Sequence, residues 1–227
     1  MTVAWVMAGF LAATPAAIPS ALETARDQQD RAALQRMVDQ EAAAATKAPN
    51  DAEAQYRLAL AASYSAEVAL EQHDRKGARA VAERGIKAGE KAVALKPDRA
   101  EYYRVLATLY GQAITDIMSG LSYGPRSKDA INKAVERAPN SSEVYVARGV
   151  GNYYLPAQLG GGTAQAMADF RKAIDLDPKN AEAYLWLGLC LRKDNKDPEA
   201  RQAFTKSLEL DPNRVWVKQQ LEKTPAK

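Results

Sequence analysis

From residue 21 onward, apolar and charged residues alternate in the pattern of amphipathic helices, in stretches rich in Ala, Leu, Lys and Glu. Ala has the highest helix propensity of the amino acids and makes up about a fifth of the 227 residues. The β-branched and aromatic residues that favour strands are few. The pattern therefore predicts an all-α protein and argues against an all-β one.

Five prolines interrupt this helical pattern. Each is expected to end a helix, because proline lacks a backbone N–H and its ring clashes with the preceding turn. In most of these turns a following Asn, Asp or Ser can cap the next helix. The five are Pro49, Pro97, Pro139, Pro178 and Pro212, and their spacings are 48, 42, 39 and 34 residues. Equivalent turns at such intervals indicate repeated helix pairs.

The last interval carries the clearest motif. Its residues are Tyr184, Leu187, Gly188, Leu191, Ala200, Phe204 and Pro212. With them the chain resembles the tetratricopeptide-repeat family, whose unit is 34 residues long. The resemblance implies an all-α fold, an α-α superhelical solenoid of helix-turn-helix repeats. It also implies that Gly188 and Ala200 are small because helices A and B of the repeat cross closely there.

The resemblance extends over a domain from residue 21 to residue 227, with about four repeats. It is clearest at 142–178 and 181–213, and a capping helix is expected at 214–224. The first three intervals exceed the family period by 14, 8 and 5 residues. The extra residues fall in the A–B turns, around 71–81, 117–126 and 158–162. Such lengthened repeats are similar in layout to regulators of microtubule dynamics and to the tetratricopeptide component of TRAP-type solute transporters.

Residues 1–20 contain no charged side chain and no His. The apolar run over 3–13 has the length of a signal-peptide core, and small residues at Thr14 and Ala16 suit a cleavage site. We therefore expect a signal peptide, a periplasmic or secreted bacterial protein, and no stable membrane span in the mature chain. The alternative is an apolar N-terminal helix that packs on the domain.

By family analogy the A helices line a concave groove, which places aromatic and arginine side chains on it. Such side chains dominate contact energy at recognition surfaces. For each one, the alternative is ordinary packing between repeats. The candidates are Tyr56, Arg57, Tyr64, Arg104, Tyr153, Tyr154, Trp186 and Arg192.

These features favour a non-enzymatic scaffold that binds a protein or peptide in its groove. The alternative is a periplasmic carrier of a small molecule or lipid, associated with transport, with Leu60, Val105, Val150, Leu185 and Leu189 lining a pocket. A net charge of +3 is too weak to indicate nucleic acid. One Cys and one His cannot form a Cys/His zinc set, and we expect no metal or cofactor.

No catalytic constellation emerges from the sequence. Residues 120–124 fit the G-x-S-x-G elbow of serine hydrolases, but that elbow follows a strand, and here a helical pattern precedes it. We expect a turn in an inserted loop at this position. His73 is expected in a solvated loop, and Cys190 as a small buried apolar residue.

Overall fold

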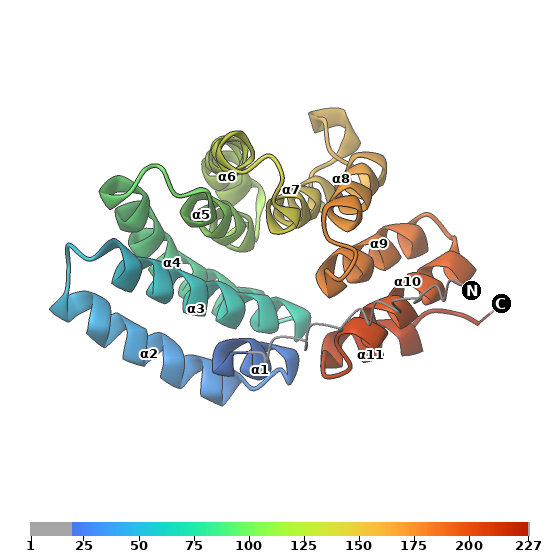
Figure 1. Cartoon of the computed structure of the whole chain (residues 1–227), viewed down its shortest axis with the longest axis horizontal. Coiled ribbons are helices and arrows are strands. Elements are labelled where there is room, and N and C mark those ends of the chain that lie inside the picture. The colour runs from blue at the N-terminus through green and yellow to red at the C-terminus, as the bar shows by residue number, and fades with distance from the viewer. Residues whose placement is uncertain (1–19, 227) are drawn as a thin grey trace, which may run out of the picture.

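A computed structural model describes residues 20–226, and within that range every regular element is a helix (Figure 1). The expected signal peptide lies outside the described residues, apart from Ser20. The elements are α1 Ala21–Asp27, α2 Arg31–Lys47, α3 Ala52–Glu71, α4 Arg75–Leu95, α5 Ala100–Gln112, α6 Ile117–Arg137, α7 Ser142–Tyr154, η1 Ala157–Leu159, α8 Thr163–Leu176, α9 Ala181–Lys193, α10 Asp197–Leu210 and α11 Val215–Glu222.

The helices form two layers. Successive odd-numbered helices contact one another, from α1 to α3, α5, α7 and α9, and each even-numbered helix packs on its neighbours in sequence. The odd-numbered helices are thus the A helices of a solenoid and line its concave face, while the even-numbered B helices cover the convex face (Figure 1). The predicted α-α solenoid is confirmed.

Residues 21–48 form the two helices α1 and α2 ahead of Pro49. The break falls at Gln29, whose φ of 55° is left-handed, and the Asp30 side chain accepts a hydrogen bond from the Ala33 N–H to start α2. The pair α1 and α2 therefore precedes the four longer pairs from α3 to α10.

Close helix crossings explain two glycines. A Cβ at Gly188 would lie 2.6 Å from the Phe204 ring, and a Cβ at Gly149 would lie 2.5 Å from the Phe170 ring. Both phenylalanines are fully buried. The interpretation of Gly188 as a close-crossing residue is confirmed, and the same contact recurs one repeat earlier.

The inserted residues take two forms. The first two insertions lengthen helices, because α3, α4 and α6 have 20, 21 and 21 residues. The third forms η1 and the glycine-rich loop before α8. The expectation of a turn at residues 120–124 is wrong, since they lie inside α6. A capping box between Asp116 and Ser119 starts this helix ahead of the two glycines and Pro125.

The apolar core has two large parts. One extends from Val38 to Val144 and the other from Ala166 to Val217, so they meet at α7. Cys190 is buried in the second part, as predicted, and burial raises the pKa of its thiol to about 12. None of the helices in residues 20–226 combines the length and the apolar character that crossing a bilayer requires.

Candidate functional site

An aromatic cluster lies on the A-helix layer where α7, α9 and α11 meet. Tyr154 contacts Tyr153 and Trp186 edge to face, with ring centroids 5.1 and 6.0 Å apart. Trp186 also contacts Trp216, at 5.5 Å. Trp186 is nearly buried, whereas Tyr154 is 68% exposed. The structure thus brings together three of the predicted groove residues, and one of them offers a free aromatic surface.

A second aromatic group lies on α3 and α5. The Tyr56 ring stacks on Tyr102 at 4.8 Å, and its hydroxyl donates to the Glu101 carboxylate at 2.9 Å. Burial, together with the Glu101 charge, raises the pKa of Tyr56 well above its usual value, so the hydroxyl stays a donor. Tyr64 lies under the Arg26 guanidinium, 5.0 Å from its ring centroid. Tyr56 and Tyr64 are half-buried.

The three predicted groove arginines all have partners within the chain. The Arg57 Nε donates to Glu41 at 3.1 Å and the Arg104 Nε donates to Glu101 at 2.6 Å. Arg192 donates to the Gln220 side chain at 2.7 Å and to the Gln220 backbone carbonyl at 3.2 Å, and so fastens the C-terminal helix. Their guanidinium groups are therefore committed to intramolecular contacts.

A buried arginine joins the two ends of the solenoid. Arg214, at the start of α11, is 1% exposed. It donates to Glu67 at 2.6 Å, to Glu182 at 3.0 Å and also to both carboxylate oxygens of Glu71. Asp27 lies 3.8 Å away. These partners come from α1, α3 and α9, so one guanidinium pairs with carboxylates from three other helices.

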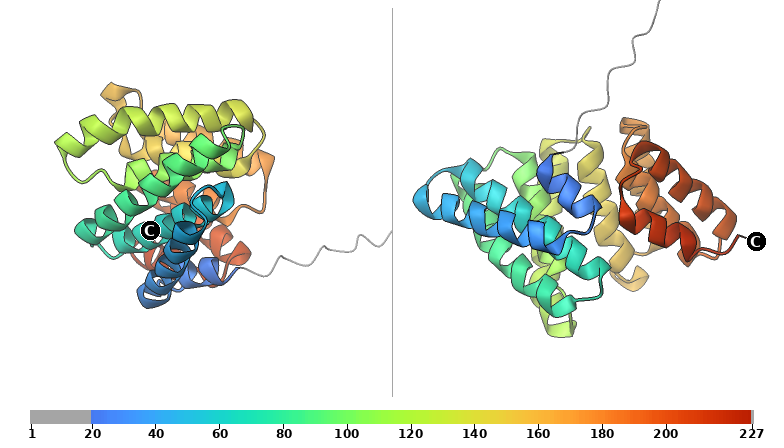
Figure 2. Two further views of the ribbon diagram at one scale, coloured as in Figure 1. Left: turned by 90° about the vertical axis from the view of Figure 1, so that its left-hand side faces the viewer. Right: turned by 90° about the horizontal axis from the view of Figure 1, so that it is seen from below.

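Further polar contacts cross the same junction. Arg26 pairs with Glu182 at 3.5 Å, and the Gln219 amide donates to Gln29 at 3.2 Å. As a result α1 and α11 lie side by side, although they stand at opposite ends of the described chain (Figures 1 and 2). We call this set of residues, Arg26, Asp27, Glu67, Glu71, Glu182 and Arg214, the closure cluster. Sequence reasoning missed it, because Arg214 occupies an ordinary repeat turn more than 140 residues from Glu67 and Glu71.

The closure cluster holds more carboxyl groups than guanidinium groups. Burial raises the pKa of Glu67 to about 7, against the opposing effect of Arg214 and Arg26. Burial also raises the pKa of Glu71 and of Asp27. Burial acts in the same direction on Glu182, but there Arg214 and Arg26 outweigh it and lower the pKa. The junction is therefore sensitive to protonation.

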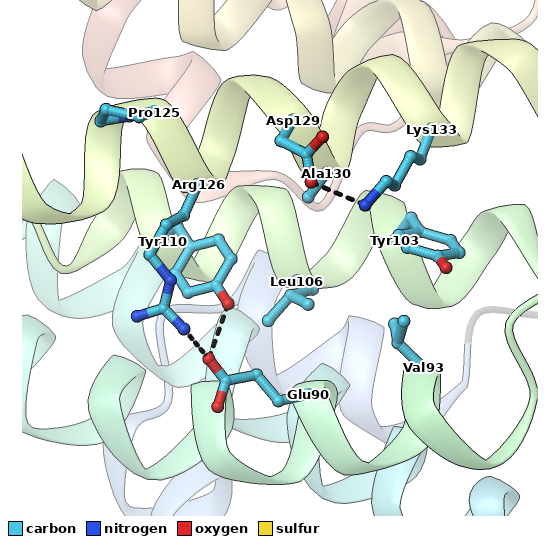
Figure 3. Close-up of a pocket in the computed structure, with 10 residues that line it drawn as sticks. All are labelled: Glu90, Val93, Tyr103, Leu106, Tyr110, Pro125, Arg126, Asp129, Ala130 and Lys133. Carbon is cyan, nitrogen blue, oxygen red and sulfur yellow. Dashed lines mark hydrogen bonds and ion pairs between the residues drawn. The ribbon is translucent and has the colours of Figure 1, made fainter.

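The residues predicted to line a carrier pocket are mostly packed away. Val105, Leu185 and Leu189 are buried in the core, and Leu60 and Val150 are half-buried. Two open pockets in residues 20–226 lie elsewhere, between successive B helices. The larger, of about 510 Å³, lies between α4 and α6. Among its lining residues, Arg126 and Tyr110 both donate to Glu90 (Figure 3).

Comparisons with known proteins agree with this architecture. The structure of a thermophilic TPR protein in Thermus thermophilus covers 88% of this chain and 97% of its own, with a TM-score of 0.63 and 20% identity. The structure of Pseudomonas aeruginosa pilF covers 76% of this chain and 66% of its own, with a TM-score of 0.52 and 19% identity. At such identities the likeness shows the fold alone.

A relative in sequence points the same way. "Small glutamine-rich tetratricopeptide repeat-containing protein 2" of Mycosarcoma maydis is 34% identical over 104 residues, which are 46% of this chain. The match spans only 28% of that relative's length.

Two family models match successive parts of the chain, and the boundary between them lies just after α7, where the two parts of the apolar core meet. The tetratricopeptide-repeat model matches residues 160–215, and the model of regulator of microtubule dynamics protein 1-3 matches residues 20–156, more than half of the chain. The chain is a tetratricopeptide-repeat protein and belongs to the regulator of microtubule dynamics protein 1-3 family.

Proposed function

We propose that this chain is a non-enzymatic scaffold that binds a segment of another protein on its concave face. The tetratricopeptide fold suggests a protein-protein interaction scaffold. The observation that carries the proposal is Tyr154, a largely exposed aromatic side chain on a cluster of other aromatic rings.

The surroundings of Tyr154 suit an anchor residue. A tyrosine offers a large contact area and loses little conformational entropy on binding. Its ring is already positioned by Tyr153 and Trp186, so binding would order few additional groups. The Lys193 ammonium lies 4.6 Å from the centroid of the Tyr153 ring and adds a cation beside the cluster.

The surface favours one kind of partner. Since Arg57, Arg104 and Arg192 are engaged within the chain, they do not form a free clamp for a partner's carboxylate. The partner segment is therefore expected to present an apolar or aromatic side chain to Tyr154, with its backbone or a polar group near Lys193.

Site-specific photocrosslinking tests this proposal. A benzoylphenylalanine replaces Tyr154 in the full chain, and the protein is irradiated in extract of its native host. The same probe at Tyr145 is the control, because Tyr145 lies on the same helix but stacks with Arg148, which binds Asp169 of α8 on the convex side. We expect a defined crosslinked partner from position 154 and not from position 145.

The crosslinked segment, made as a peptide, then gives the affinity test. Tyr154→Ala should weaken its binding about tenfold or more, as truncation of an anchor residue does, whereas Tyr145→Ala should leave it unchanged. Equal crosslinking at both positions, or equal affinity in both variants, would count against the concave face as the binding surface.

We also propose that residues 1–20 are a cleaved export signal and that the mature protein is periplasmic or secreted. The support is the uncharged apolar composition of this segment. Intact mass analysis of the protein from its native host tests this. Recovery of soluble protein that retains residues 1–16 would refute cleavage at Ala16.

A further inference from the structure

All five A–B turns lie on one rim of the solenoid, because each A helix runs antiparallel to the B helix that follows it. Hydrogen bonds join neighbouring turns along this rim. Gln29 donates to Glu71 at 2.8 Å, and Thr163 to Asp194 at 2.8 Å. Between them, Arg79 of α4 donates to Asp116 at 3.2 Å. We call this edge the A–B rim.

Exposed apolar side chains concentrate on the A–B rim. In the described part of the chain seven large apolar side chains are exposed, and only Leu95 lies away from this rim. The largest group belongs to the start of α6, where Ile117, Met118 and Leu121 are 82%, 74% and 69% exposed. The remaining three are Ile114, Tyr154 and Leu159. A concentration of this kind usually marks an interaction surface.

The start of α6 projects beyond its partner helix. Ser127 donates to the Ala107 carbonyl at 2.9 Å, and Arg137 to the Pro97 carbonyl at 2.8 Å, which fixes the alignment of α6 against α5. Since α5 ends at Gln112, the first turns of α6 extend past it (Figure 2, left). Ile117 and Leu121 are four residues apart, so they lie on one face of this projecting segment.

The projecting segment is held in place by polar contacts. Asp116 and Ser119 form a capping box, and Arg79 binds Asp116 from α4. One helical turn later, the Tyr123 hydroxyl donates to Glu83 of α4 at 3.3 Å. The apolar side chains are therefore presented by an anchored helix, and a fixed protrusion can meet another surface without first being ordered.

The small, protruding shape of this patch fits a lipid bilayer better than a second copy of the protein. A stable interface between two protein copies needs about 800 Å² from each partner, and three aliphatic side chains on a protrusion supply much less. A lipid bilayer needs no complementary hollow, since apolar side chains enter the boundary between headgroups and acyl chains. Arg75 and Lys76 are exposed on the neighbouring turn, where cations can meet lipid phosphates.

We propose that the start of α6 docks on a lipid surface, with Ile117, Met118 and Leu121 inserted below the headgroups and Arg75 and Lys76 at the level of the phosphates. The inserted side chains belong to α6, whereas Tyr154 lies at the end of α7 on the same rim, and the lipid docking does not depend on the proposed peptide binding.

Depth measurement by spin labelling tests the proposal on the full chain. Because Cys190 is fully buried, a nitroxide can be attached selectively to a new cysteine in Met118→Cys. The control is Asp98→Cys, an exposed position in the turn between α4 and α5, on the opposite rim. Vesicles of phosphatidylcholine with about a quarter phosphatidylglycerol provide the surface.

We expect vesicles to raise oxygen accessibility at position 118 and lower its accessibility to a water-soluble relaxant, with no change at position 98. Ile117→Ser combined with Leu121→Ser should reduce vesicle binding about tenfold. If the protein binds vesicles while the label at position 118 remains as accessible to the water-soluble relaxant as the label at position 98, the proposal is overturned. The binding would then belong to another segment, such as residues 1–20. Spin-spin broadening at position 118 without vesicles would overturn it in favour of self-association, and no vesicle binding would overturn it outright.

Discussion

Single residues in this protein have effects that depend on what surrounds them, and its glycines show this directly. A Cβ at Gly188 would run into the Phe204 ring, whereas a Cβ at Gly151 would meet nothing within 4 Å beyond the backbone of its own helix. Both lie inside A helices. The repeat motif identified the first glycine correctly, because a close helix crossing leaves a mark in the local sequence.

We predict opposite effects of alanine at these two glycines. Gly188→Ala should lower the free energy of unfolding by about 1–3 kcal/mol, because Phe204 has to shift in a tightly packed core. Gly151→Ala should raise it by up to about 1 kcal/mol, because alanine favours the helix. Urea denaturation of both variants measures the difference, and a loss of similar size in both would contradict the crossing argument.

Glu67 gives the protein a pH-dependent stability. Its pKa is about 7 in the folded chain and near 4.5 in the unfolded chain. The stabilisation is fully present below about pH 4.5 and is lost as the pH rises through about 7, because the unfolded state releases the proton first. The free energy of unfolding should therefore fall by up to about 1.4 kcal/mol per pH unit in this window on account of Glu67.

The Glu67→Gln variant isolates this contribution. Its amide oxygen can still accept from Arg214 but cannot titrate. The loss of stability between about pH 5 and about pH 7 should be smaller in this variant than in the parent chain, while Glu199→Gln, at an exposed carboxyl, should follow the parent. Denaturant unfolding across the range is the measurement, and identical slopes in all three proteins would contradict the assignment.

At the scale of an element, α6 shows where local sequence rules are overridden. Gly120, Gly124 and Pro125 all disfavour a helix interior, and a turn was expected at residues 120–124. The helix forms because its capping box satisfies the first backbone N–H groups, and because Tyr123 stacks on Tyr110 at 5.9 Å. Packing between neighbouring helices cannot be seen from a single segment.

Ser119 is expected to be the critical residue for the start of α6. Its side-chain oxygen accepts from the Thr115 and Asp116 N–H groups, both at 3.0 Å, and the residue is nearly buried. Ser119→Ala should cost about 1–3 kcal/mol, because those N–H groups lose their partner. Ser122→Ala, at an exposed position of the same helix, should be close to neutral. Thermal unfolding distinguishes them, and equal melting temperatures would show that the cap is dispensable.

At the scale of the whole molecule, the α-α solenoid could be predicted, but the contact between its ends could not. Proline turns and the 34-residue motif depend on neighbours in sequence, so they are visible in the chain itself. The closure cluster depends on the accumulated rotation of every helix pair, and no local pattern records that rotation. The family motif also predicts which arginines lie on the A helices. It does not predict their partners within the chain, because those contacts depend on how the helices pack.

Arg214→Met tests the closure. The substitution keeps much of the side-chain volume but leaves buried carboxylates from α3 and α9 without their main partner, and it removes the more distant pairing with Asp27 of α1. We expect a loss of about 3–5 kcal/mol near neutral pH and a larger radius of gyration in small-angle scattering. Arg57→Met, which removes an exposed pair with Glu41, should change neither by much. A variant at position 214 with parental stability and radius would show that the ends are held without the cluster.

Most solenoids can gain or lose a repeat, because each unit contacts only its neighbours. Joined ends remove that freedom. One more helix pair between α8 and α9 would rotate Glu182 and Arg214 away from Glu67, and one fewer would do the same in the opposite sense. The number of helix pairs is thus fixed by geometry, as the number of strands is in a closed barrel. Duplication or deletion of a helix pair is tolerated in an open array. In this protein it should separate the two ends and expose the charges of the closure cluster to water.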